Sequence, residues 1–233
     1  GKGARLERAG IRFQPADLCD RPAVRGLCEG IEAVVHCAAR SSPWGAEQAF
    51  VRYNVEATDA VIDACQAQRV ARLIHVSTPS LYMDGRDRDQ IREDDPLPPP
   101  INHYAATKRL CEERVLRAAG EGLGSIILRP RAIFGPGDTT IFPRVLRALE
   151  TGRLPVIGRG DNRVDLTYID NAVQAVERAL AAPSRCLGRT YNVSDGEPVL
   201  LWGVLRWLCD ELGLPPPRGS LPRSAALALA GGL

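Results

Sequence analysis

The feature that most constrains the fold of this chain is an alternation of short apolar runs with helical stretches. The runs at residues 32–38, 72–77 and 125–128 have the length and continuity of buried strands. Residues 47–68 and 103–119 between them are predicted to be helical. Strands that alternate with helices form a parallel sheet covered on both faces. The sequence therefore predicts an α/β fold with a doubly wound parallel sheet, and a ligand crevice at the carboxyl ends of its strands.

Shorter elements are expected before and after this core. Gly10 closes a predicted helix end, residues 11–14 are predicted to be a short strand, and Asp20 is expected to cap a helix that Gly30 ends. After Gly137 the elements become shorter. We therefore expect a sheet domain over residues 1–135 and a smaller lobe over residues 136–233, with residues 164–195 returning in part to the sheet.

Composition and charge exclude several classes of protein. Apolar residues make up 45% and charged residues 25% of the 233 residues, and the formal net charge of +2 is too small to favour nucleic acid or an anionic membrane. No apolar run reaches the roughly 18–20 residues of a membrane span. The seven cysteines form no CxxC pair. We expect reduced thiols in the cytoplasm, with neither a disulfide framework nor a metal site.

Tyr104 and Lys108 lie four residues apart on a predicted helix, and therefore on one face of it. A free tyrosine has a pKa of roughly 10, which a nearby ammonium is expected to lower by stabilising the phenolate. Such a tyrosine can exchange a proton with the oxygen of an alcohol or ketone. The spacing alone is more typical of an ordinary surface pair, so the hypothesis depends on its context.

Ser77 and Thr78 supply that context, because they follow a predicted central strand at the expected crevice. A hydroxyl there could hydrogen-bond a substrate oxygen as charge develops on it. Ser, Thr and Pro also favour turns, and a turn at this place would leave the hydroxyls facing the crevice. The two interpretations are compatible.

Four segments together resemble a known family: HVSTPSLY (75–82), HYAATK (103–108), LRPRAIFGPGD (128–138) and RVDLTYIDNAV (163–173). They are similar to extended short-chain dehydrogenases/reductases of the NAD-dependent epimerase/dehydratase superfamily. Within these they resemble the 3β-hydroxysteroid dehydrogenase-type branch, including the 2-alkyl-3-oxoalkanoate reductases. The resemblance covers about residues 4–207 and implies a Rossmann-like sheet with a small C-terminal substrate lobe.

The resemblance also implies roles for individual residues. Tyr104 matches the catalytic acid/base, Lys108 its partner that also binds the nicotinamide ribose, and Thr78 the catalytic hydroxyl. The other implied cofactor contacts are Asp17 and Leu18 along the adenine, Cys37, Ala38 and Ala39 along the ribose, Ser77, and Pro130 and Ile133 near the nicotinamide amide. For Asp17, an ordinary turn or cap residue is an equal alternative. His36 is interpreted as a strand-core residue and Asn54 as structural.

The chain departs from the family at its start. The family opens with a strand and a Gly-rich turn whose N–H groups bind the pyrophosphate. No such strand and turn precede Asp17, so we expect this chain to lack the phosphate-binding start. The residue that chooses between the two dinucleotides would be absent with it, and the implied cofactor is NAD or NADP.

Three functions follow as expectations. The first is an NAD(P)-dependent oxidoreductase that interconverts a secondary alcohol and a ketone on a lipid-like or sterol-like small molecule. The second is a nucleotide-sugar epimerase or dehydratase, for which Arg144, Arg147 and Arg163 could bind a diphosphate. The third is an inactive, truncated dinucleotide-fold protein. Neither nucleic acid nor a membrane span is expected, and a homodimer is left open.

Overall fold

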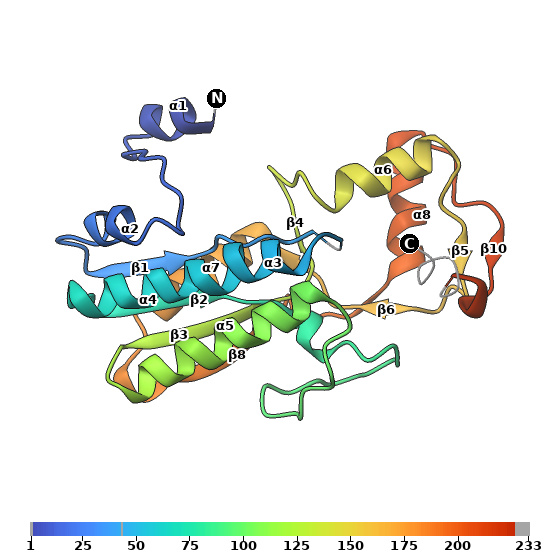
Figure 1. Ribbon diagram of the computed structural model, residues 1–233. Coiled ribbons are helices and arrows are strands. Elements are labelled where there is room, and N and C mark those ends of the chain that lie inside the picture. Colours follow the sequence, from blue (N-terminus) through green and yellow to red (C-terminus); the bar gives the residue numbers. More distant parts are fainter. Residues whose placement is uncertain (1, 43, 227–233) are drawn as a thin grey trace. The chain divides into compact units, whose positions relative to one another are not determined.

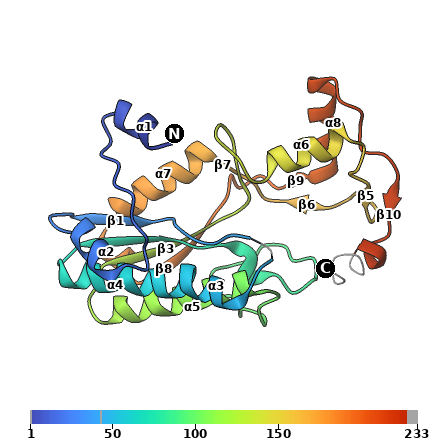
Figure 2. The same ribbon diagram turned by 45° about the horizontal axis from the view of Figure 1, so that its top comes forward.

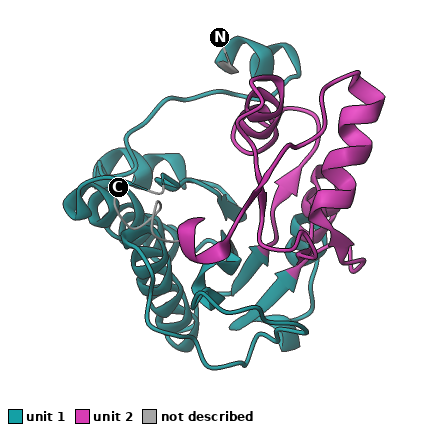
Figure 3. Ribbon diagram, turned by 90° about the vertical axis from the view of Figure 1, so that its right-hand side faces the viewer, with its two compact units in different colours: residues 1–129, 176–192 teal, residues 130–175, 193–233 magenta. Residues whose placement is uncertain are grey.

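A computed structural model describes residues 2–42 and 44–226 of the chain (Figure 1). The chain divides into two compact units (Figure 3). Residues 1–129 and 176–192 belong to the first unit, and residues 130–175 and 193–233 to the second. Among the described residues, no helix combines the length and the apolar character that crossing a bilayer requires.

A four-stranded sheet of order β1-β2-β3-β8 forms the centre of the first unit. Its strands are β1 (Ala33–His36), β2 (Arg72–Val76), β3 (Ser125–Pro130) and β8 (Arg189–Val193), of which the last two each end one residue inside the second unit. β2 pairs in parallel with both β1 and β3, with His75 opposite His36 and Ile127. The parallel sheet that the alternation predicts is confirmed.

Helices cover this sheet on both faces. Figures 1 and 2 place α4 (Ala57–Ala67) and α5 (His103–Gly120) against one face, and the part of α7 (Ile169–Leu180) that belongs to this unit, from Val176 onward, against the other. The end of α7 is bound to β2, because Arg72 Nη1 donates to the carbonyl oxygens of Ala179 at 3.0 Å and Ala182 at 2.6 Å. The remaining helical segments of this unit are α1 (Lys2–Arg8), α2 (Arg21–Leu27), α3 (Glu47–Phe50), the π-helical η1 (Val51–Glu56), and the 3-10 turns η2 (Pro79–Tyr82) and η3 (Ser184–Cys186).

The main apolar core lies where α2, α4 and α5 pack on β2 and β3. It consists of small and branched side chains: Val24, Cys28, Val61, Ile62, Ala64, Cys65, Val70, Leu73, Val115, Ala118, Leu123 and Ile127. The predicted cap of α2 is confirmed, since the Asp20 carboxylate accepts a hydrogen bond from Ala23 N at 3.2 Å. Gly124, just before β3, is required by close approach, because a Cβ there would lie 2.5 Å from the Ala71 carbonyl oxygen.

Two predictions about strands are wrong. Residues 11–14 are irregular, and Ile11 and Phe13 are exposed, because among the described residues no strand lies beside them to complete their backbone hydrogen bonds. The apolar run at 32–38 forms β1, but it is not buried on both faces, and Val35 is 38% exposed. β1 pairs with β2 alone and is therefore an edge strand of the sheet that the structure describes.

The described part of the second unit consists of short strand pairs and helices. The pairs are β4 (Ile133–Phe134) with β7 (Thr167–Tyr168), β5 (Val156–Ile157) with β10 (Ser220–Leu221), and β6 (Arg163–Val164) with β9 (Val199–Leu200). Its helices include α6 (Phe142–Glu150) and α8 (Leu201–Leu212), and the first seven residues of α7 also belong to it. The ring of Phe134 lies 5.8 Å from that of Phe142 and 5.5 Å from that of Tyr168, so aromatic contacts connect α6 with the β4–β7 pair.

Candidate active site

The ends of β1 and β2 and the beginning of α5 together build the candidate site in the first unit. Ser77 and Thr78 directly follow β2. α5 begins at His103 because the Asn102 side chain caps it, accepting a hydrogen bond from Ala105 N at 2.8 Å. This cap places Tyr104 in the first turn of α5 and Lys108 one turn later, as the sequence predicts.

Thr78 serves both a turn and the site. Its Oγ1 accepts a hydrogen bond from Ser80 N at 3.2 Å and donates one to Ser80 Oγ at 3.0 Å, and thereby caps the 3-10 turn η2. The same side chain lies close enough to the Tyr104 hydroxyl to act on its pKa. The structure therefore brings together the two residues that the resemblance pairs, and the turn interpretation holds as well.

The protonation of Tyr104 differs from the expectation. Burial raises the pKa of Tyr104 above its ordinary value of 10.0, and the nearby Thr78 side chain opposes this rise only in part. The expectation that Lys108 lowers the pKa of Tyr104 is wrong for this structure, because the ammonium of Lys108 hydrogen-bonds other groups. A phenol with a raised pKa keeps its proton at neutral pH and is prepared to act as an acid.

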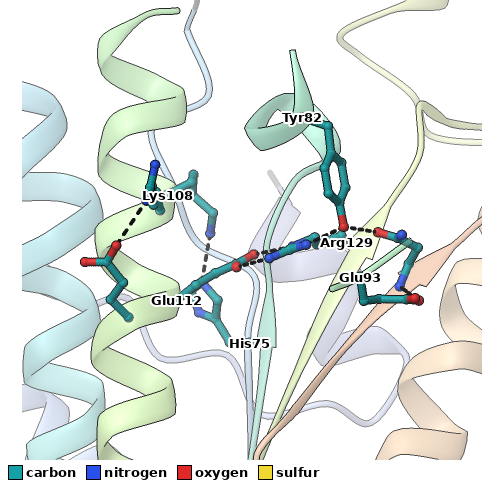
Figure 4. A network of polar contacts seen from close by, with 9 residues as sticks. His75, Tyr82, Glu93, Lys108, Glu112 and Arg129 are labelled. Carbon is teal, nitrogen blue, oxygen red and sulfur yellow. Dashed lines mark hydrogen bonds and ion pairs between the residues drawn. The ribbon is translucent and has the colours of Figure 1, made fainter. Parts of the chain in front are cut away.

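Lys108 is 2% exposed and points into the sheet. Its Nζ lies 3.0 Å from His75 Nε2 and donates to the Val76 carbonyl oxygen at 2.8 Å (Figure 4). Burial lowers the pKa of Lys108, and the nearby Cys111, Glu112 and Cys37 act in the opposite direction. Lys108 is therefore held in place by β2, the strand that Ser77 and Thr78 follow.

The predicted cofactor contacts near β1 and β2 differ in exposure. Cys37, Ala38 and Ala39 are exposed at the carboxyl end of β1, and Cys37 lies near enough to Lys108 for their charges to interact. Ser77 is buried, and its Oγ has no hydrogen-bond partner among the described residues. Exposed residues at a strand end next to a buried hydroxyl without a described partner are an arrangement that a ligand could complete.

The other predicted contacts lie in ordinary structural settings. Asp17 accepts a hydrogen bond from Cys19 N at 3.0 Å, which lowers its pKa, and pairs with Arg52 at 3.4 Å. These contacts are those of a turn residue, and its contact with adenine stays a prediction. Leu18 packs against the core. Pro130 ends β3 and Ile133 begins β4, both in the second unit, and their roles also stay predictions.

The sequence interpretation missed a buried polar network behind the site. Arg129 Nε donates to Glu112 Oε1 at 2.8 Å, Arg129 Nη2 donates to Glu112 Oε2 at 2.5 Å, and Arg129 Nη1 donates to the Tyr82 hydroxyl (Figure 4). It also missed His75, which is fully buried. The available signal was a polar residue inside an apolar strand, two positions before Ser77 and therefore on the same face. His36, in contrast, is the core residue that was expected, with Nε2 3.1 Å from Thr58 Oγ1.

Comparison with known proteins agrees with this geometry. The chain is 37% identical over 219 residues to a 2-alkyl-3-oxoalkanoate reductase of Stenotrophomonas maltophilia, a match that covers 90% of this chain and 66% of the relative. It is 35% identical over 240 residues to 3beta-hydroxysteroid-dehydrogenase/decarboxylase isoform 1 of Arabidopsis thaliana, covering 98% of this chain and 54% of the relative. The chain thus spans between about half and two thirds of these relatives.

Solved structures and a family model give the same assignment. The structure of MoeE5 in complex with UDP-glucuronic acid and NAD matches with a TM-score of 0.77 and 26% identity, over 91% of this chain and 72% of that one. The family model described as the NAD dependent epimerase/dehydratase family matches residues 2–194. The resemblance and the Rossmann-like fold are confirmed, and the chain belongs to the NAD-dependent epimerase/dehydratase family.

Proposed function

We propose that this protein is an NAD(P)-dependent oxidoreductase that interconverts a secondary alcohol and a ketone on an apolar, lipid-like or sterol-like substrate. The observation that carries the proposal is that Thr78 lies beside Tyr104, and Lys108 one helical turn later on α5, at the carboxyl end of β2 in one unit. Because the chain spans only part of its relatives' length, the proposal concerns the activity of the whole protein.

The three residues have complementary roles in ketone reduction. Tyr104, which stays protonated at neutral pH, donates its proton to the carbonyl oxygen as the carbonyl carbon is reduced. The Thr78 hydroxyl, by turning its one proton from Ser80 Oγ to the substrate, stabilises the charge that develops on that oxygen. The ammonium of Lys108 carries three N–H donors, and the described residues accept two of them. The third is available to stabilise the Tyr104 phenolate that forms.

A dinucleotide fits the described residues in part. Exposed residues Cys37, Ala38 and Ala39, the buried hydroxyl of Ser77 and the third N–H of Lys108, the last two without a partner among the described residues, would together hold a ribose and a nicotinamide. The bound dinucleotide supplies hydride transfer to or from the carbon that bears the oxygen. Among residues 2–42, no strand followed by a Gly-rich turn precedes β1 to bind the pyrophosphate. The fit therefore concerns the ribose and nicotinamide only.

The second unit supports an apolar substrate. It contains a cavity of about 560 Å³ lined mainly by apolar and aromatic side chains, among them Phe134, Phe142, Leu166, Tyr168 and Trp207. Its Asp195 is already occupied, because it accepts hydrogen bonds from Tyr168 N at 3.0 Å and Asn171 Nδ2 at 2.8 Å. No Arg or Lys is among the described residues that line the cavity. The names of the two relatives, an alkyl-oxoalkanoate reductase and a hydroxysteroid dehydrogenase, point to the same substrate class.

A nucleotide-sugar epimerase or dehydratase is the second candidate. It is favoured by the similarity to MoeE5, whose structure holds UDP-glucuronic acid together with NAD. Arg144 and Arg147 on α6 and Arg163 on β6 are the residues that this alternative would require for the diphosphate.

The decisive experiment compares substrates and one pair of variants. The protein is assayed for reduction of a 2-alkyl-3-oxoalkanoate, oxidation of a 3β-hydroxysteroid and conversion of UDP-sugars, with NAD(H) and NADP(H). We expect the first or second activity, and we expect Tyr104→Phe to lower turnover by about 10²-fold or more while NADH binding is kept. Tyr53→Phe, at an exposed tyrosine, is the matched control. Epimerisation of a UDP-sugar, or undiminished turnover by Tyr104→Phe, would overturn the proposal.

A further inference from the structure

His75 and Lys108 form a polar contact in the interior of the first unit. His75 lies on β2 with 0% of its surface exposed, and Lys108 on α5 is 2% exposed. The distance from His75 Nε2 to Lys108 Nζ is 3.0 Å (Figure 4). A lysine is seldom buried without paired groups, and here the His75 imidazole and the Val76 carbonyl accept hydrogen bonds from Lys108.

The chemistry of the two groups fixes the direction of this hydrogen bond. An ammonium can only donate, so Nε2 accepts and the ring proton of the neutral imidazole is carried by Nδ1. His75 Nδ1 is buried and has no partner among the described residues. A buried unpaired donor destabilises a fold, so stability alone gives no reason for a histidine at this place.

His36 provides an internal comparison. It lies directly opposite His75 in the register of β1 and β2, with the two ring centroids 5.2 Å apart. Its Nε2 is hydrogen-bonded to Thr58 Oγ1 at 3.1 Å, whereas His75 Nε2 contacts the lysine. The two buried imidazoles thus lie side by side on neighbouring strands, and the contact with Lys108 distinguishes His75 from His36.

We propose that His75 is the positioning residue for Lys108. The imidazole accepts one N–H of the ammonium, the Val76 carbonyl accepts the second, and the third is held ready for the Tyr104 oxygen or for a ribose hydroxyl. This role in turnover rests on the proposed function. The contact itself can be tested without any substrate, because it concerns only how firmly the charged form of Lys108 is held.

Several other groups face this pair and bear on its pH dependence. His36 and Cys37 approach from the end of β1, and Cys111 and Glu112 from α5. The experiment therefore compares variants that leave all four unchanged with a variant of His36.

Nuclear magnetic resonance of the lysine side chains gives the direct test. The chain contains only two lysines, Lys2 and Lys108, so ¹⁵N-lysine labelling yields few signals and Lys108→Met identifies the relevant one. His75→Leu removes the acceptor and should lower the pKa of Lys108 by about 1 to 2 pH units, the worth of a charge-assisted hydrogen bond. His75→Gln places an amide oxygen near the position of Nε2 and should restore most of the pKa. His36→Gln should leave it unchanged.

The outcomes separate this inference from the proposed function. If Lys108 keeps its wild-type pKa in His75→Leu, or if His36→Gln lowers the pKa of Lys108 by the same amount as His75→Leu does, the positioning role is overturned. Should His75→Leu fail to fold, His75→Asn takes its place, because its shorter amide cannot reach Nζ, and the same pKa decrease is expected. In turnover, His75→Leu should lower kcat on the order of 10-fold with little change in KM, and His75→Gln should rescue it. A wild-type protein without oxidoreductase activity would contradict the proposed function and leave the resonance result valid.

Discussion

Arg129 and Glu112 form a doubly hydrogen-bonded ion pair in the interior of the first unit, with side chains that are 5% and 4% exposed. The pair joins β3 to α5, the helix that carries Tyr104 and Lys108. Arg129 also donates to the Tyr82 hydroxyl, which in turn donates to Asn192 Oδ1 at 3.0 Å (Figure 4). The network thus connects α5 with two strands of the sheet, β3 and β8.

We expect Glu112→Gln to lower the free energy of unfolding by about 3 to 5 kcal/mol, because it leaves the buried guanidinium of Arg129 without its counter-charge. Glu113→Gln is the matched control. It breaks the exposed pair with Arg109 on the same helix, where a loss of about 1 kcal/mol or less is expected. Urea unfolding of both variants measures the two losses. Similar losses in the two variants would contradict the expectation that the buried Arg129–Glu112 pair contributes more to the free energy of unfolding than the exposed pair does.

Thr78→Val should reduce turnover on the order of 10²-fold, because it removes the hydroxyl that stabilises charge on the substrate oxygen. Thr78→Ser keeps the hydroxyl and should stay near the wild-type rate. Thr78→Val also loses the cap of η2, which is expected to cost about 1 kcal/mol of stability. Steady-state kinetics at a temperature where both variants are folded separates the two effects. Equal rates for Thr78→Val and Thr78→Ser would assign this residue to the turn alone.

His36 makes the stability of the first unit dependent on pH. Burial, with a further contribution from the charge of Lys108, lowers the pKa of His36 from 6.5 to about 4. Between pH 6.5 and 4 the unfolded chain therefore binds a proton that the folded chain does not bind, and the free energy of unfolding falls as the pH decreases. The total effect of this one group is about 3 kcal/mol, fully lost only near pH 4.

The prediction is tested by urea unfolding of wild type and His36→Gln from pH 8 to 4. The difference between the two proteins should be constant above about pH 7 and should shift in favour of the variant as the pH falls from 6.5 to 4. His75 is present in both proteins, and burial, the main cause of its own lowered pKa, is left in place by the variant. Two curves that stay parallel over the whole range would contradict the assigned shift.

The sequence by itself determined the local structure and the family. The cap at Asp20, the helix that carries Tyr104 and Lys108 on one face, and the strand before Ser77 all follow from short-range spacing. They can be predicted because helix and strand periodicity and side-chain caps depend on residues a few positions apart. The motifs around Thr78, Tyr104 and Ile133 were sufficient for the resemblance, which the comparisons confirm.

The tertiary structure alone decided the surroundings of the charged groups. Lys108 meets His75, 33 residues earlier in the chain, and not the hydroxyl of Tyr104 four residues earlier. Glu112 meets Arg129 from a different element, and β1 lies at the edge of the sheet, where Val35 is exposed. The reason is that a pKa depends on how much water is removed from a group and which distant segments replace it. Spacing along the chain places a side chain on a face, but only packing decides what lies against that face.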